Sequence, residues 1–124
     1  MLVGFQGSGK SATGNTILGR RAFDEHPMGG ASSTPAAKQC YYGKSTIDEH
    51  TIVVVDTPGL LDAEGVSNAD DTREKFSREI VKCLLLSSPG PHAILLVIRM
   101  TRLSNRLQGA TRLIEDMFGT EAKR

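Results

Sequence analysis

The sequence predicts an α/β fold with a mostly parallel sheet, and three observations lead to that class. Short apolar runs rich in branched residues, such as 52–55 (IVVV) and 93–98 (AILLVI), predict buried strands. Segments with a helical spacing of apolar residues separate these runs. A glycine-rich stretch at 4–9 joins a short apolar start to one such helical segment. The expected order is therefore β, α, β, β, α, β, α, with helices on both faces of the sheet.

The first half of the chain is expected to hold one strand, one helix and a pair of strands. Residues 1–3 are a strand stub, and 10–18 is a helix that Gly19 ends, because glycine readily takes the left-handed conformation of a helix cap. Gly14 lies inside this helix. Glycine costs about 1 kcal/mol relative to alanine there, so we expect either close packing or a weak helix. The expected segments that follow are a loop at 23–37, a strand at 39–47, a turn at 48–50 and a strand at 51–55.

The second half is expected to hold two amphipathic helices around one strand. Phe76, Ile80 and Leu84 recur at a spacing of four residues, which makes one helical face apolar. The segment 87–91, rich in Pro and Gly, ends that helix because proline cannot continue it. The expected segments are a loop at 56–71, a helix at 71–86, a buried strand at 92–98 and a last helix at 107–117, which Phe118 and Gly119 close.

The composition favours one small intracellular domain. The net charge is +1 and the basic residues are scattered, so we expect no nucleic-acid partner. The longest apolar runs are too short to span a bilayer and no signal-peptide pattern opens the chain. We therefore expect no transmembrane segment and a cytoplasmic location. The two cysteines, Cys40 and Cys83, are far apart in the sequence. We expect them to be reduced thiols that form neither a disulfide nor a zinc site.

The stretch 4–11 fits the pattern G-x-x-x-x-G-K-[ST] of a phosphate-binding loop. Glycines let successive backbone N–H groups turn towards an anion, and the following helix adds unpaired N–H groups and the positive end of its dipole. Lys10 would place its ammonium on the β- and γ-phosphates, and Ser11 would give its hydroxyl to Mg²⁺. The alternative is a flexible glycine turn before an ordinary helix. The strand before the motif and the helix after it favour a P-loop NTPase, with the loop residues Gly4, Phe5, Gln6, Gly7, Ser8, Gly9, Lys10 and Ser11.

A second motif, DTPG at 56–59, follows a buried strand, at the edge where open α/β sheets bind their ligands. Asp56 can hold Mg²⁺ directly or through water, and Gly59 can offer its N–H to a γ-phosphate because no side chain blocks the approach. Loss of that phosphate would release the loop, as in the switch of a GTPase. The alternative is a plain exit from a strand, because all four residue types form turns. Together with the loop at 4–11, the motif favours a GTPase over kinases and helicases.

Three stretches together resemble the AIG1-type family, the GTPases of immunity-associated proteins. They are GSGKSATGNTILG at 7–19, VVVDTPGLLD at 53–62 and CLLLSSPGPHAILLVI at 83–98. The third is the most specific, because a box of the form C-x-L-x-S-x-P-G-P-H-A is a mark of this family, whereas phosphate loops occur in many. The likeness covers nearly the whole chain. It implies a Ras-like G-domain sandwich, of which residues 1–124 would be the N-terminal part, with the C-terminal strands missing.

The resemblance implies a guanine nucleotide, GTP or GDP, as the ligand and Mg²⁺ as the metal. By motif, the segment from Gly7 to Ala12 would cradle the phosphates, Ser11 and Asp56 would hold the metal, and Gly59 would sense the γ-phosphate. In this family, hydrolysis is typically slow or absent in single subunits. Homo- or heterodimers form through the G domain, and some members assemble on intracellular membranes. We therefore expect a nucleotide-dependent switch in the cytoplasm or at such membranes.

The sequence also departs from the family pattern. The base-reading N/T-K-x-D segment does not occur in the 124 residues, so guanine rather than adenine specificity rests on the resemblance. The threonine that the first switch loop offers to Mg²⁺ falls on Ala37 here, and Thr34 is the nearby substitute. The first strand, 1–3, is also short, and a missing edge strand would leave 93–98 unpaired on one side, with open N–H and C=O groups.

Catalysis has the weakest support in the sequence. No glutamine follows DTPG where Ras-like enzymes orient water, which fits slow turnover. Arg102, after the strand at 92–98, is the candidate for an arginine finger across a dimer; the alternative is a solvated loop arginine. Whether the chain is an enzyme thus stays open. Two other interpretations remain: a truncated, nucleotide-incompetent interaction fragment of such a GTPase, and a P-loop kinase or ATPase, which DTPG disfavours.

Overall fold

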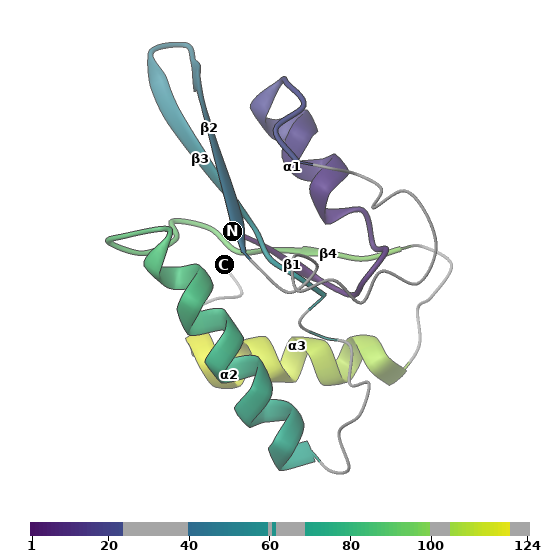
Figure 1. Cartoon of the computed structure of the whole chain (residues 1–124). Coiled ribbons are helices and arrows are strands. Elements are labelled where there is room, and N and C mark those ends of the chain that lie inside the picture. Colours follow the sequence, from purple (N-terminus) through teal and green to yellow (C-terminus); the bar gives the residue numbers. More distant parts are fainter. Residues whose placement is uncertain (24–39, 60, 62–68, 100–104, 120–124) are drawn as a thin grey trace.

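In the described part of the chain, a sheet of four strands lies between helices on its two faces (Figure 1). The computed structural model describes residues 1–23, 40–59, 61, 69–99 and 105–119. In spatial order the strands are β2 (Tyr41–Ile47), β3 (His50–Asp56), β1 (Leu2–Gly4) and β4 (Leu95–Val97). Strand β1 runs parallel to both β3 and β4, whereas β2 runs antiparallel to β3. The predicted mostly parallel sheet is therefore confirmed.

In the residues that the structure describes, three helices complete the order β1, α1, β2, β3, α2, β4, α3, as predicted. Helix α1 (Lys10–Leu18) covers one face of the sheet, and α2 (Ala69–Leu85) and α3 (Asn105–Phe118) cover the other (Figure 1). The bounds of α1 are those expected, because a glycine in the left-handed conformation stands at each end. The φ angle is 98° at Gly9 and 64° at Gly19.

Each face of the sheet has its own apolar core. On the face of α1, Leu18 packs with strand residues, and on the face of α2 and α3, Phe76 and Ile80 do so. Burial on both sides of β1 fixes this strand at the centre of the molecule. The buried members are Leu2, Leu18, Phe23 and Val54 on the first face, and Val3, Leu61, Phe76, Ile80 and Ala110 on the second.

Gly14 lies in close packing, which resolves the two options that its position in the helix left open. A Cβ at Gly14 would lie 2.7 Å from the Phe23 ring and 3.1 Å from the Leu2 side chain. The neighbouring Asn15 fixes the chain after α1. Its amide donates to the Phe23 carbonyl at 2.8 Å, and its Oδ1 accepts the N–H groups of Ala22 and Phe23. Glycine therefore makes room for an aromatic ring that asparagine holds in place.

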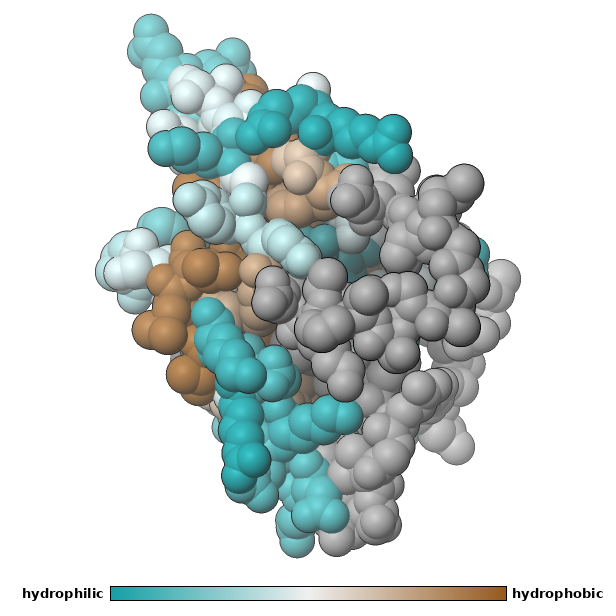
Figure 2. Space-filling view, viewed as in Figure 1, coloured by the Kyte–Doolittle hydropathy of each residue, from teal (hydrophilic) through white to brown (hydrophobic). Residues whose placement is uncertain are grey.

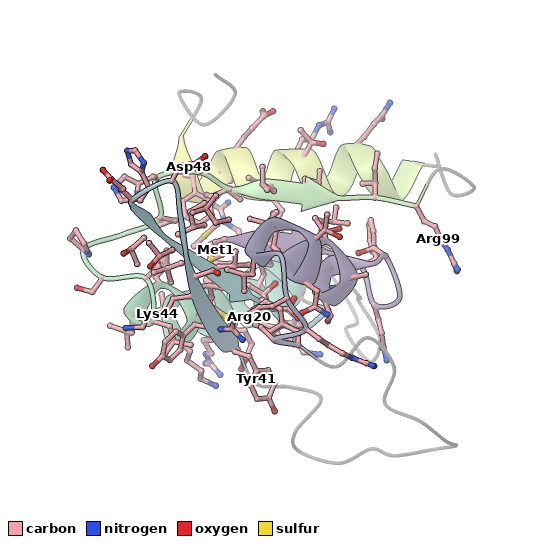
Figure 3. The ribbon with its side chains drawn as sticks, turned by 90° about the horizontal axis from the view of Figure 1, so that it is seen from above. Met1, Arg20, Tyr41, Lys44, Asp48 and Arg99 are labelled. Carbon is pink, nitrogen blue, oxygen red and sulfur yellow. A yellow bond between two sulfur atoms is a disulfide. The ribbon has the colours of Figure 1, made fainter. Side chains whose placement is uncertain are left out.

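A tight turn joins β2 and β3 into a hairpin. Both turn residues, Asp48 and Glu49, have positive φ angles of 48° and 65°, which is the conformation that matches the twist of a two-residue hairpin. The guanidinium of Arg20 donates to the carbonyl oxygen of Lys44 at 2.8 Å (Figure 3). This contact ties the end of α1 to the outer strand of the hairpin.

The strand expected at 92–98 is shorter and less buried than predicted. Strand β4 stands at one edge of the described sheet, and Leu95 and Ile98 are 43% and 41% exposed. An apolar run thus predicted a strand correctly but not its burial, which depends on neighbours that the run does not specify. Figure 2 shows further exposed apolar side chains over the C-terminal end of α2, where the exposed residues are Val81, Leu85 and Leu86.

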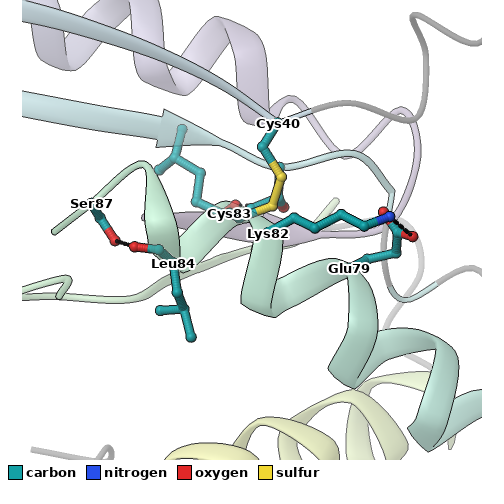
Figure 4. Close-up of a disulfide and its surroundings, with 8 residues drawn as sticks. Cys40, Glu79, Lys82, Cys83, Leu84 and Ser87 are labelled. Atoms are coloured by element: carbon teal, nitrogen blue, oxygen red, sulfur yellow. Dashed lines mark hydrogen bonds and ion pairs between the residues drawn. A yellow bond between two sulfur atoms is a disulfide. The ribbon is translucent and has the colours of Figure 1, made fainter.

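The expectation of two reduced cysteines is wrong. Cys40 and Cys83 form a disulfide that joins the start of β2 to the end of α2 (Figure 4). Their Cα atoms are 5.4 Å apart, which lies within the range that disulfides span. The two residues are 43 positions apart in the sequence, so no local cysteine spacing indicated that they pair.

Candidate functional site

The glycine-rich loop connects β1 to α1 and makes a tight turn. Gly7 and Gly9 have positive φ angles of 70° and 98°, a conformation that side chains disfavour. A Cβ at Gly4 would clash with the carbonyl oxygen of Val97. The glycines of the motif therefore stand where the backbone needs them. The expected nucleotide-binding residues from Gly4 to Ala12 all lie in this loop, at the end of β1 or in the first turn of α1.

Lys10 begins α1 and lies folded against the loop. Its side chain is only 7% exposed, and its Nζ donates to the carbonyl oxygens of Phe5 at 2.8 Å and Gly4 at 3.3 Å. These bonds hold an ammonium beside the loop backbone and the open N-terminus of the helix. A positive charge and unpaired helical N–H groups together favour an anion at this place.

Ser11 and Asp56 meet, although 45 residues separate them. The Ser11 hydroxyl donates to Oδ2 of Asp56 at 2.7 Å. Ser11 is in the first turn of α1 and Asp56 is the last residue of β3, so both stand at the same end of the sheet as the loop. The structure thus joins the two residues that the sequence assigned to Mg²⁺.

Asp56 has a buried carboxylate group, and one of its two oxygens lacks a hydrogen-bond partner in the described part of the chain. The residue is 7% exposed, and its Oδ1 has no hydrogen-bond partner in the described part of the chain. Burial raises the pKa of Asp56 above its ordinary value of 3.8, and the Ser11 hydrogen bond and the Lys10 charge oppose that shift. A buried carboxylate oxygen without a partner calls for a ligand. Mg²⁺ fits, because it prefers carboxylate and hydroxyl oxygens and neutralises the charge.

Thr57 has a positioning role that the sequence did not reveal. It is 3% exposed, and its hydroxyl donates to the Leu2 carbonyl at 2.8 Å. The bond fixes the chain directly after Asp56 to the strand that leads into the glycine-rich loop. A threonine after a buried strand, between an acid and a proline, was the available signal. Ser8, one of the predicted loop residues, has a buried hydroxyl that likewise has no hydrogen-bond partner in the described part of the chain.

No described contact connects three of the expected site residues to the glycine-rich loop or to the Ser11–Asp56 pair. Gly59 follows Asp56 by three positions and is half-buried, and no described hydrogen bond joins it to the loop. Thr34 and Arg102 lie outside the described residues, as does Ala37. Their assignments to metal binding and catalysis therefore stay predictions.

The described residues contain neither a clustered metal site nor a membrane-spanning helix. Within the ranges given above, no three His, Cys, Asp or Glu side chains come together in a way that could hold a metal ion. The Ser11–Asp56 pair is a site of a different kind, with a single carboxylate. None of the described helices is both long and apolar enough to cross a membrane.

The sequence matches the AIG1 family over residues 1–124. Immune-associated nucleotide-binding protein 7 of Arabidopsis thaliana is 37% identical over 123 residues, which are 98% of this chain and 36% of that protein. Human GTPase IMAP family member 8 is 36% identical over 124 residues, which are 100% of this chain and 17% of that protein. The chain therefore spans about a third or less of the length of these relatives.

Two solved structures share the fold. Toc33 from Arabidopsis thaliana, in complex with GDP and Mg²⁺, superposes with a TM-score of 0.67 at 22% identity, over 98% of this chain and 44% of that one. A chain of the chloroplast translocon components atToc33 and psToc159, for which dimerization is important for the GTPase activity, gives a TM-score of 0.68 at 23% identity, over 97% and 44%. With the family match over its full length, the chain belongs to the AIG1 family and has the α/β fold of a G domain.

Proposed function

We propose that this chain binds a guanine nucleotide, GTP or GDP, together with Mg²⁺, and that the protein acts as a nucleotide-dependent switch. The observation that carries the proposal is the contact between Ser11 and Asp56 at 2.7 Å beside the folded-back Lys10. The buried Oδ1 of Asp56 has no hydrogen-bond partner in the described part of the chain, so this oxygen is available to bind a ligand. The Toc33 structure in complex with GDP and Mg²⁺ supports the choice of ligand.

Each part of the site has a distinct role in this proposal. The backbone N–H groups of the loop and of the first turn of α1 would surround the phosphates. Lys10 would exchange its carbonyl partners for phosphate oxygens, which are stronger acceptors for an ammonium. Ser11 and Asp56 would hold Mg²⁺, which would supply positive charge to offset the negative charge of the phosphates. Thr57 keeps Asp56 in place through its bond to β1.

Hydrolysis, assembly and location are further parts of the proposal. We propose slow GTP hydrolysis that depends on homo- or heterodimers through the G domain; the importance of dimerization for the translocon GTPases supports this. Arg102→Ala, measured at high protein concentration, tests the arginine-finger hypothesis, and unchanged hydrolysis would contradict it. We also propose a cytoplasmic location, with assembly at intracellular membranes, which fractionation of cells expressing the tagged protein tests.

Nucleotide titration tests the binding proposal. Fluorescent GTP, GDP and ATP are added to the chain with Mg²⁺, and the same is done for Lys10→Ala. A matched control is Lys75→Ala, which removes an exposed lysine from α2. We expect guanine nucleotides to bind the wild type and the control but not Lys10→Ala. Preference for ATP would favour a P-loop kinase or ATPase. No binding by a chain with the native circular dichroism spectrum would favour an interaction fragment and overturn the proposal.

A further inference from the structure

The disulfide joins the start of β2 to the end of α2. Cys40 directly precedes β2, and Cys83 is the third residue from the end of α2 (Figure 4). Helix α2 follows β3 and the DTPG motif along the chain. The bond therefore ties the entry of the hairpin to the helix that comes after Asp56.

The bond lies one residue from the strand position opposite Asp56. Tyr41, the first residue of β2, is the register partner of Asp56, the last residue of β3. Antiparallel partners restrain each other through the ladder, and a ladder is weakest at its ends. An anchor on Cys40 thus holds the end of the hairpin where the metal-binding carboxylate stands.

The other end of the bond is fixed in the core. Cys83 is 0% exposed and follows Phe76 and Ile80 on the buried face of α2. That face packs with Val3, the residue before Gly4, at which the glycine-rich loop begins. Cys40 is half-buried, so it is the more exposed residue of the pair. The geometry gives a rigid anchor at Cys83 and a releasable attachment at Cys40.

We infer that the Cys40–Cys83 pair is a redox modification site, at which a dithiol reductant opens the bond and weakens the hold on Mg²⁺ and nucleotide. The effect on the ligand rests on the function proposed above. Disulfides in reducing compartments are usually transient and redox-sensing, and the proposed cytoplasmic location places the pair in such a compartment. These 124 residues contain two cysteines, so no other thiol among them competes for this bond.

The chemistry is a two-electron exchange. A thiolate of the reductant attacks the Cys40 sulfur, the S–S bond breaks, and Cys83 leaves as a thiolate that takes up a proton. The second thiol of the reductant then displaces Cys40 from the mixed disulfide, and the reductant becomes a cyclic disulfide. Two electrons and two protons pass to the protein, which ends with two thiols. With Cys40 free, the β2 end opposite Asp56 loses its covalent support.

Nucleotide release in the two redox states tests the inference. The chain is treated with a mild thiol oxidant or with dithiothreitol, and free thiols are counted under denaturing conditions. The release rate of a fluorescent GDP analogue is then measured in the presence of Mg²⁺. We expect no free thiols and slow release after oxidation, then two thiols and release about fivefold or more faster after reduction. Free thiols that persist after oxidation, or equal release rates, would overturn the inference.

The control removes the bond without a reductant. Cys40→Ser with Cys83→Ala is expected to release nucleotide at the rate of the reduced wild type and to ignore dithiothreitol. A double variant that still responds would contradict the inference, because its response could not pass through this pair. Cys40→Ser alone serves the same comparison with the buried thiol of Cys83 kept in the core.

A second measurement keeps failure of the inference apart from failure of the proposed function. Amide hydrogen exchange at Tyr41–Gly43 needs no nucleotide. Reduction is expected to speed exchange there and to leave the α1 amides unchanged. If nucleotide fails to bind in both redox states, the proposed function fails, and exchange alone decides the redox site. Unchanged exchange at the start of β2 would overturn it.

Discussion

The Ser11 hydroxyl and the Asp56 carboxylate lie 2.7 Å apart because β1 leads into α1 and pairs with β3. Strand β1 leads into the loop before α1 and pairs in parallel with β3, so the start of α1 and the end of β3 reach the same end of the sheet. Parallel pairing thus brings a hydroxyl and a carboxylate from distant parts of the sequence into one site.

Asp56→Asn should remove the response to Mg²⁺ with little change in the fold. Asparagine keeps the shape of the side chain and its contact with Ser11 but loses the charge that holds a divalent cation. We expect nucleotide affinity in Mg²⁺ to fall about 10- to 100-fold, equivalent to about 1.4–3 kcal/mol. Titration with and without Mg²⁺ measures this. The control Asp48→Asn changes an exposed turn aspartate whose positive φ angle asparagine tolerates, and a similar loss there would contradict the assignment.

The raised pKa of Asp56 predicts a specific dependence on pH. Burial favours the neutral carboxyl group, so this group contributes stability to the metal-free protein at low pH. That contribution is lost as the pH rises from near 3.8 through the higher pKa of the folded state. Chemical unfolding of wild type and Asp56→Asn should therefore show the wild type losing stability relative to the variant over this window. A constant difference between the two proteins would contradict the sign.

Mg²⁺ should reverse this dependence. The cation binds the ionised carboxylate, so Mg²⁺ affinity is expected to fall as the pH drops through the raised pKa of Asp56. Magnesium titration followed by calorimetry across the same window measures the effect. The folded state must be verified by circular dichroism at each pH, so that unfolding is not taken for loss of the ligand.

Two helical glycines should respond to alanine with opposite signs. A Cβ at Gly14 would press on the Phe23 ring at 2.7 Å, whereas a Cβ at Gly109 in α3 meets nothing within 4 Å. Gly109→Ala gains helix propensity and should raise the free energy of unfolding by up to about 1 kcal/mol. Gly14→Ala gains the same propensity but overpacks the core, which typically costs about 1–3 kcal/mol, so its net effect should be destabilising. Denaturant unfolding compares them, and equal shifts would refute the packing role of Gly14.

Local signals predicted most of the fold. Glycines at both ends fixed the bounds of α1, and the β-branched run marked β3. The edge position of β4 was expected from the family pattern, although the apolar run alone predicted burial. The sequence could not predict the tertiary contacts: the Cys40–Cys83 bond depends on how α2 packs beside the hairpin. In the sequence, Asn15 likewise looks like an ordinary polar residue of a helix. Only the fold shows that the chain after α1 turns back, so that the Asn15 amide donates to the Phe23 carbonyl.

The candidate site was predictable where a motif carries the chemistry and not where a single contact does. The glycine pattern and DTPG named Lys10, Ser11 and Asp56, because phosphate and Mg²⁺ demand those groups at those spacings. Thr57 was missed, because its partner is a main-chain carbonyl 55 residues away. The place of Thr57 after a buried strand could mark it as a candidate, but a main-chain partner has no residue type by which the sequence could identify it.

Thr57 offers the last prediction, since its hydroxyl can be removed without changing its shape. Valine keeps the branched side chain but leaves the buried Leu2 carbonyl without this donor, which should cost about 1–3 kcal/mol of unfolding free energy. Thr57→Ser keeps the hydroxyl and loses only a methyl group, so it should cost less. Because the bond also fixes the end of β3, Thr57→Val is expected to weaken Mg²⁺-dependent nucleotide binding more than Thr57→Ser. Unfolding and titration of both variants decide it: if serine is as damaging as valine, packing of the methyl group holds Asp56 in place and the hydrogen bond does not.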